Sequence, residues 1–305
     1  MLDVCLLGTG GMMPLPYRWL TSLMMRYNGD SILIDCGEGT QIAMRKKGWS
    51  PHSIKVICFT HFHADHISGL PGMLLSMGNS DRTEPLLIIG PKGIARVVNS
   101  LRVIAPELPF DINFLEIEEN GQAFEMEGYT IKAYKLNHNV PCFGYTFEVS
   151  RAGRFDAERA KEQNIPLKLW SRLQKGETIT EDGVTYTPQM VLGPERRGLK
   201  VAYCTDTRPT PNISEAAAGA DIFICEGMYG GPDSAEKVKE HKHLNFVEAG
   251  RMAASADPQP KEMWLTHYSP SMSYPHDYEK EVRAIFANTI VAKDGHSAEL
   301  RFDDE

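Results

Sequence analysis

The chain has 305 residues, of which 42% are hydrophobic and 24% are charged, as in ordinary soluble globular proteins. This length can bury a sizeable core in one large domain or two small ones. The formal net charge of −8 argues against a surface coated with basic side chains for nucleic acid, although a local basic segment is compatible with it.

The amino-terminal residues and the cysteines indicate a compartment. Residues 1–8 contain no basic n-region and no small residues of the cleavage type, so we expect no signal peptide. No apolar run approaches the roughly 20 residues needed to cross a bilayer, so we expect no membrane association. The six cysteines are scattered without a Cys-x-x-Cys pair, which predicts buried thiols in a reducing compartment. The predicted location is the cytoplasm.

In chain order, apolar runs alternate with helical patterns, and the middle of the chain is richer in strands. The turn Asn28-Gly29-Asp30 is a strong hairpin signal between two of these strands. Alternation of this kind predicts a layered α/β fold. The predicted strands cover 3–8, 21–27, 31–35, 54–60, 85–89, 112–118, 123–126, 129–136, 144–149, 199–205, 221–225, 262–266, 289–292 and 297–302. The predicted helices cover 40–47, 69–77, 92–104, 156–163, 214–218, 246–254 and 278–287.

One cluster, at the end of the predicted strand 54–60, carries the strongest chemical signal. His61, His63, Asp65 and His66 lie within six positions. The first two are two residues apart and point the same way while the chain is still extended. The other two reach a second point only after the chain turns. This spacing favours two metal ions a few ångströms apart over one ion, and over a polar turn that happens to hold three histidines.

Other predicted strands also end in a carboxylate or an imidazole. Loops at the carboxyl ends of strands converge over one face of a fold, so these residues are candidates for the same site. Histidines combined with carboxylates suit borderline ions such as zinc. The additional candidates are Asp35, His138, Asp206, Glu226 and His267.

The segment 150–200 differs from the rest of the chain in charge. It contains ten Lys and Arg against seven Asp and Glu, a net charge of +3, so the remaining residues carry −11. By composition alone this segment is equally compatible with an inserted arm and with an ordinary surface excursion.

The cluster and its partners resemble the metallo-β-lactamase superfamily, and within it the ribonuclease Z family of tRNA 3′-processing endoribonucleases. The resemblance covers most of the chain and implies an α/β fold, the four-layer αβ/βα sandwich, as a single domain over 1–305. The matching motifs include Leu7-Gly8-Thr9-Gly10, Ile34-Asp35-Cys36-Gly37-Glu38-Gly39-Thr40-Gln41, His61-Phe62-His63-Ala64-Asp65-His66, Gly69-Leu70-Pro71-Gly72 and Tyr203 to Pro209.

The resemblance also implies a ligand set for two Zn²⁺ ions per chain, with Mn²⁺ or Fe²⁺ as alternatives. His61, His63 and His138 would hold the first ion. Asp65, His66 and His267 would hold the second, and Asp206 would bridge the two. Asp35 would orient the metal loop by hydrogen bonds without ligating.

The implied activity is zinc-dependent cleavage of the 3′ trailer from precursor tRNA by a hydroxide that bridges the two ions. Asp65 would position or deprotonate the water, and His243, oriented by Glu226, would donate a proton. The residues alone do not decide whether His241 or His243 is the proton donor, and the resemblance favours His243. One alternative is a hydrolase of small phosphodiesters or of sulfate esters, lactones or thioesters without tRNA activity. Another is a non-catalytic metal-bound RNA-binding or scaffold protein.

The resemblance further implies that residues 150–198 form a tRNA-binding arm and that the protein is a homodimer. Three departures from the family pattern bear on the RNA substrate. The segment Pro14 to Trp19 lacks the family's lysine and asparagine, Asn245 replaces a threonine, and Ser271 stands where the family usually has an arginine.

Overall fold

The computed structural model describes residues 1–231 and 234–303 and contains two compact units. The first unit comprises residues 1–147 and 200–301, and the second comprises residues 148–199 with the end of the chain.

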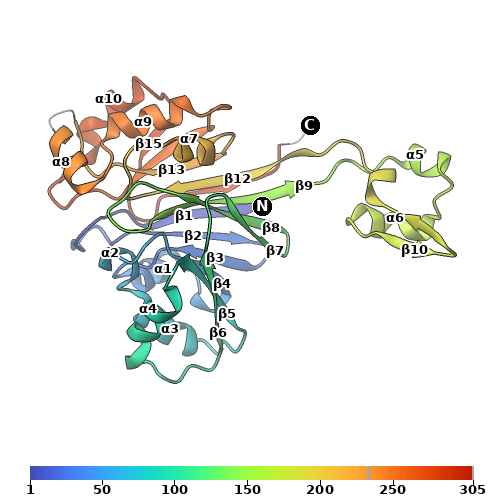
Figure 1. Ribbon diagram of the computed structural model, residues 1–305, viewed down its shortest axis with the longest axis horizontal. Helices are drawn as coiled ribbons and strands as arrows, with labels where there is room; N and C mark the ends of the chain where they lie inside the picture. Colours follow the sequence, from blue (N-terminus) through green and yellow to red (C-terminus); the bar gives the residue numbers. More distant parts are fainter. Residues whose placement is uncertain (232–233, 304–305) are drawn as a thin grey trace. The chain divides into compact units, whose positions relative to one another are not determined.

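The first unit is built on two seven-stranded sheets (Figure 1). One has the order β16-β1-β2-β3-β4-β5-β6, and the other has the order β15-β14-β13-β12-β9-β8-β7. The strands of the first sheet are β1 (Leu2–Gly8), β2 (Ser22–Tyr27), β3 (Asp30–Ile34), β4 (Ile54–Cys58), β5 (Leu86–Pro91), β6 (Ile112–Ile117) and β16 (Ser297–Leu300). Those of the second are β7 (Gln122–Met126), β8 (Tyr129–Lys135), β9 (Phe143–Arg151), β12 (Arg196–Cys204), β13 (Ile222–Glu226), β14 (Glu262–Thr266) and β15 (Thr289–Val291).

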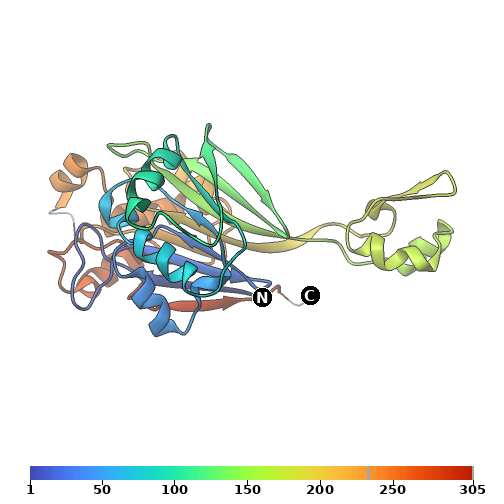
Figure 2. The same cartoon turned by 90° about the horizontal axis from the view of Figure 1, so that it is seen from below.

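Helices cover the outer face of each sheet (Figures 1 and 2). Helices α1 (Thr40–Lys47), α3 (Leu70–Gly78) and α4 (Ile94–Leu101) share a buried apolar cluster with β1–β5. Helices α7 (Pro211–Ala217), α9 (Phe246–Ser255) and α10 (Glu279–Arg283) share another with β12–β14. Burial of these apolar faces is the main stabilising contribution to the two outer layers.

The inner faces of the two sheets pack on each other. The Tyr145 hydroxyl donates to the Phe59 carbonyl at 2.6 Å, and the hydroxyls of Thr21 and Tyr203 lie 2.8 Å apart. The polar tips of these buried tyrosines are thus satisfied across the sandwich, as burial of a hydroxyl requires. The four layers, helix, sheet, sheet and helix, confirm the predicted αβ/βα fold.

The second unit has a small core of its own. Helices α5 (Ala157–Glu162) and α6 (Leu167–Gln174) pack with the hairpin β10 (Ile179–Glu181) and β11 (Val184–Tyr186). The buried residues of this core are Ala160, Ile165, Leu169, Leu173, Ile179 and Val191.

Most predicted strands and helices are confirmed to within a few residues. The predicted helices did not include α2 (Ala64–Ile67), α6 or α8 (Ala235–His241). The predicted helix 278–287 is shorter, because α10 ends at Arg283, whose Nε donates to the Thr289 carbonyl at 2.9 Å. Within the described ranges no helix is long and apolar enough to cross a bilayer.

Candidate metal centre

The predicted ligands come together because several strands end at the same edge of the sandwich. Strands β3 and β4 are parallel neighbours in one sheet, and β12, β13 and β14 are parallel neighbours in the other. Three residues just beyond strand ends, Asp35, Asp206 and His267, have left-handed φ values of 59°, 52° and 60°. For residues other than glycine this conformation costs roughly 1–2 kcal/mol each. Such strain is typical of functional sites, where the surrounding structure fixes the side-chain direction.

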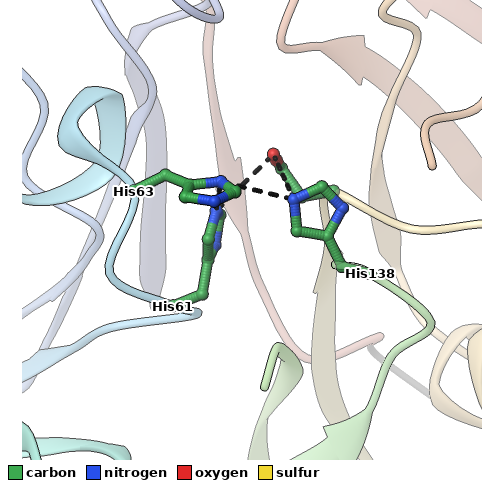
Figure 3. Close-up of side chains that lie close together, drawn as sticks. His61, His63 and His138 are labelled. Atoms are coloured by element: carbon green, nitrogen blue, oxygen red, sulfur yellow. Dashed lines mark hydrogen bonds and ion pairs between the residues drawn. The ribbon is translucent and has the colours of Figure 1, made fainter. Parts of the chain in front are cut away.

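Three imidazoles form the first ligand group (Figure 3). His63 Nδ1 lies 2.9 Å from His61 Nε2 and 3.3 Å from His138 Nε2. The Asp206 Oδ2 atom lies 3.6 Å from His61 Nε2 and 3.8 Å from His138 Nε2. These four side chains therefore present one nitrogen or oxygen atom each to a common point.

The second group faces the other oxygen of Asp206. Asp206 Oδ1 lies 3.2 Å from both His66 Nε2 and His267 Nε2. Asp65 Oδ2 lies 3.6 Å and 3.4 Å from the same two nitrogens. Since the two oxygens of Asp206 serve different groups, this carboxylate has the geometry of a bridge between two cations.

Burial and charge favour cations at both points. Burial lowers the pKa of His61, His63 and His138, so these imidazoles are neutral at pH 7 and carry a free lone pair. Burial also lowers the pKa of His66, but the surrounding carboxylates of Asp206, Asp35 and Asp65 outweigh it and raise this pKa well above its usual value. A cluster of carboxylates that stabilises an imidazolium stabilises a divalent cation for the same reason.

The donor set fits a metal ion. The neutral imidazole nitrogens of His61, His63 and His138, at 2.9 and 3.3 Å, cannot all donate to one another, so lone pairs converge at a buried point. A cation at that point removes the repulsion. Histidine nitrogens with carboxylate oxygens are ligands that zinc and similar divalent ions prefer. His61, His63, His138 and Asp206 would hold one ion, and Asp65, His66, His267 and Asp206 the other.

Hydrogen bonds from a further set of residues fix the ligand rings. Asp35 Oδ2 lies 2.8 Å from His66 Nδ1, and the same carboxylate accepts from the Thr60 amide at 2.9 Å. The Lys242 carbonyl lies 3.1 Å from His138 Nδ1. Such contacts set the ring orientation and the tautomer that leaves the other nitrogen free for metal. The position of Asp35 matches the supporting role that the sequence suggested.

Glu226 and His243 form a buried pair beside the ligands. Glu226 Oε2 lies 2.9 Å from His243 Nδ1, and Glu226 Oε1 accepts from the Thr207 amide at 2.6 Å. His243 Nδ1 is 3.9 Å from Asp206 Oδ2. Burial by itself lowers the pKa of His243, but the charge and hydrogen bond of Glu226 more than compensate and raise this pKa to about 9. His243 is therefore protonated at neutral pH and able to donate.

A cavity of about 200 Å³ opens onto the ligands. His63, Asp65, His138, Asp206, His243 and His267 line it, and so does His241, the alternative that the residues alone left open. Met12, Asn139 and Tyr229 also line it, and the sequence did not assign these three to the site. The His241 side chain is about half exposed, whereas His243 is buried.

One hydrogen bond in this cavity could not be predicted from the sequence. The Met12 amide donates to Asp65 Oδ2 at 2.7 Å from a residue with a φ of 66°. The neighbouring Gly11 is required, since a Cβ there would lie 2.6 Å from His267 Cε1. Only the approach of the amino-terminal loop to the strand ends creates this hydrogen bond.

The three departures from the family pattern have definite structural environments. Asn245 caps α9, because its side chain accepts from the Glu248 amide at 2.9 Å, so it performs a capping role open to threonine as well. Arg18 is buried and donates to the carbonyls of Ser269 and Met272. The Ser271 and Ser269 hydroxyls lie 2.8 Å apart.

Comparison with solved structures identifies the class of fold. The chain superposes on human tRNase Z, short form, with a TM-score of 0.70 and 22% identity, over 98% of this chain and 100% of that one. It superposes equally on the metallo-β-lactamase fold protein YhfI from Bacillus subtilis, with a TM-score of 0.70 and 18% identity over 97% and 98% of the two chains. The chain therefore has the metallo-β-lactamase fold.

Sequence comparison identifies the family. The chain is 59% identical over 303 residues to ribonuclease Z of Lachnoclostridium phytofermentans, which covers 99% of both chains. It is also 59% identical to ribonuclease Z of Lachnospira eligens over the full length of both. A family model described as "Anti-Pycsar protein Apyc1" matches residues 2–163, more than half of the chain. The chain belongs to the ribonuclease Z family, with residues 2–163 also falling within the family of that model, and it is a metal-dependent endoribonuclease.

Proposed function

We propose that this protein cuts precursor tRNA and removes its 3′ trailer, using two Zn²⁺ ions in the candidate metal centre. The observation that carries the proposal is the bridging position of Asp206, whose two oxygens face two separate ligand groups. Two ions so placed suit in-line displacement at a phosphodiester, because both the attacking and the leaving oxygen need stabilisation. The 59% identity to proteins named ribonuclease Z supports tRNA as the substrate.

When bound, the ions would lower the pKa of a coordinated water and offset negative charge on the phosphate. The chain's own residues hold and move the protons. His66 and His267 hold the pKa of Asp65 below its usual value despite burial, so this carboxylate is ionised and can accept a hydrogen bond that positions the attacking water. The Met12 amide, 2.7 Å from Asp65 Oδ2, fixes the direction of that carboxylate.

The proton donor in this proposal is His243. Its ring lines the cavity above the ligands, and the Glu226 carboxylate keeps it protonated at neutral pH. A protonated imidazole at this position can hydrogen-bond the scissile phosphate and then donate to the leaving oxygen. Glu226 acts through His243 and does not face the cavity.

Residues 150–198 serve in this proposal as the tRNA-binding arm of a single domain that spans residues 1–305. The net charge of +3 in the surrounding window supports contact with RNA phosphates. The fold of this segment as a unit with its own core supports a separate binding function.

The remaining proposals concern metal identity, assembly and location. Zinc is proposed over Mn²⁺ and Fe²⁺ because imidazoles outnumber carboxylates in the ligand set. A homodimer is proposed from the family resemblance. The cytoplasm is proposed because all six cysteines are buried free thiols, which suits a reducing compartment.

A cleavage assay with end mapping tests the function. Zinc-loaded protein is incubated with a tRNA that carries a 3′ trailer, and the 5′ and 3′ products are sequenced. Cleavage next to the discriminator nucleotide is expected. Hydrolysis of small phosphodiesters without any cleavage of the precursor would overturn tRNA as the substrate and leave a general phosphodiesterase.

A further inference from the structure

A second cavity of the first unit shares a wall with the metal-centre cavity. Its volume is about 220 Å³, and Tyr229 lines both cavities. The Tyr229 ring lies 6.3 Å from the ring of His243, the proposed proton donor. The two cavities are therefore neighbours that share the Tyr229 side chain. The residues that line the second cavity include Tyr229, Gly230, Ser234, Lys237, Ser271 and Tyr278.

The walls of this cavity are fixed by packing. The Tyr278 ring lies against Gly230, where a Cβ would come within 2.3 Å of the ring, and the Phe246 ring lies 5.9 Å from it. The Ser234 hydroxyl donates to the Gly231 carbonyl at 2.6 Å. Ser271 has a small side chain and leaves the space beside Tyr278 open.

The polar groups of the cavity suit an oxyanion. Lys237 on α8 is exposed, and no hydrogen bond or ion pair engages its ammonium group among the described residues. The hydroxyls of Ser234 and Ser271 keep lone pairs and can still rotate to serve an additional partner. A lysine ammonium with nearby hydroxyls is a common way to bind a phosphate as a point charge.

One carboxylate stands near the rim. A Cβ on Gly231 would lie 3.7 Å from Glu281 Oε2, so Glu281 weakens the positive potential of the cavity without occupying it. The same carboxylate gives the site a variant with the opposite expected effect, since its neutralisation should strengthen the binding of an anion.

We propose that this cavity binds the phosphate of a nucleotide adjacent to the scissile phosphate, with Lys237 as the cation and Ser234 and Ser271 as hydrogen-bonding partners. The proposal rests on the proposed cleavage of RNA, and it extends that function to a defined specificity residue. In this proposal the Tyr229 side chain lies between the nucleotide at the cleavage site and its neighbour.

The test neutralises the phosphates of the substrate one at a time. Precursor tRNAs are prepared with a single methylphosphonate linkage at each position next to the cleavage site, and kcat/KM is measured for each. Lys237→Met is compared with Lys239→Met, which removes an exposed lysine from the same helix that does not line the cavity. Circular dichroism and metal content establish that both variants are folded and loaded.

With intact RNA, Lys237→Met should lower kcat/KM by about three- to tenfold. It should also make the negative slope of log(kcat/KM) against log salt shallower by about 0.7. In the wild type and in Lys239→Met, one neighbouring methylphosphonate should cause a loss of similar size, whereas Lys237→Met should show no further loss at that linkage. Lys237→Arg should restore the sensitivity, and Glu281→Gln should raise kcat/KM.

Two failures are distinguishable. If the wild type cleaves the intact precursor but Lys237→Met responds to every methylphosphonate as the wild type does, the subsite is refuted and the proposed function stands. Equal losses in the two lysine variants also refute it. If the wild type does not cleave the precursor at all, both the proposed function and this subsite are wrong.

Discussion

The metal centre and the basic segment of the second unit use charged side chains in opposite ways. At the metal centre the ligands are largely buried, and hydrogen bonds fix their rings. In the second unit the basic side chains are exposed, and several already pair with acids of the same unit. Lys168 pairs with Glu181, and Arg172 Nε lies 2.7 Å from Glu177 Oε2.

The difference follows from what each region has to do. Catalysis at a phosphodiester needs ligands and proton donors at fixed positions, so each side chain requires support from its neighbours. Attraction of a polyanion needs only charge near a surface, and exposed ion pairs cost little to exchange for phosphate contacts. We therefore expect a single substitution at the metal centre to abolish most of the activity. In the second unit we expect the affinity for RNA to fall in proportion to the charge removed.

The largest effect is expected for Asp65→Ala. This change removes a proposed ligand of one ion and the carboxylate proposed to position the attacking water, so kcat should fall by about 10³-fold or more on every substrate. Single-turnover cleavage of precursor tRNA and hydrolysis of a small phosphodiester measure it, with circular dichroism as the control for folding. Turnover at the wild-type rate would refute the assigned site.

A smaller and selective effect is expected when a short Gly/Ser linker replaces residues 150–198. Because this segment supplies proposed phosphate contacts and no ligand of the metal centre, cleavage of precursor tRNA should fall by about 100-fold or more in parallel with binding. Hydrolysis of a small phosphodiester should persist. An equal loss on both substrates would mean that the segment supports the fold of the first unit and would contradict a dedicated binding role.

An intermediate effect is expected for Glu226→Gln. The carboxylate raises the pKa of His243 to about 9, so the donor is protonated below that pH and loses its proton as the pH rises through it. The amide removes this effect while burial continues to lower the pKa, so the alkaline limb of the rate profile should move to lower pH. At pH 8 we expect a loss of about 10- to 100-fold. A pH–rate profile with an unmoved alkaline limb would exclude His243 as the donor.

The smallest effect is expected for the double substitution Lys161→Met with Lys175→Met in the second unit. No ion pair holds either side chain in the described part of this unit, so both are available for phosphate contacts. The affinity for precursor tRNA should fall about two- to tenfold at low salt, and the difference should shrink as salt rises. The matched control is Lys168→Met, which removes a lysine already paired with Glu181 and should have less effect.

The sequence determined the fold class and pointed to the candidate ligands. The cluster from His61 to His66 is local, so the alternation of an extended strand with a turn was enough to separate two pairs of ligand atoms. The buried strands are visible in the sequence as apolar runs. Several of these runs end in, or are followed closely by, an Asp, a Glu or a His. Strand ends therefore revealed residues two hundred positions apart as members of one site.

Tertiary structure alone decided how these residues meet. The division of the Asp206 oxygens between two groups depends on a left-handed φ of 52°, which no local pattern indicates. The Met12 amide reaches Asp65, and Lys237 reaches the second cavity, through loops and a short helix without hydrophobic periodicity. Helix α6 and the hairpin that packs on it were also missed. Periodicity records which face of an element is buried, whereas these contacts depend on where separate elements come together in space.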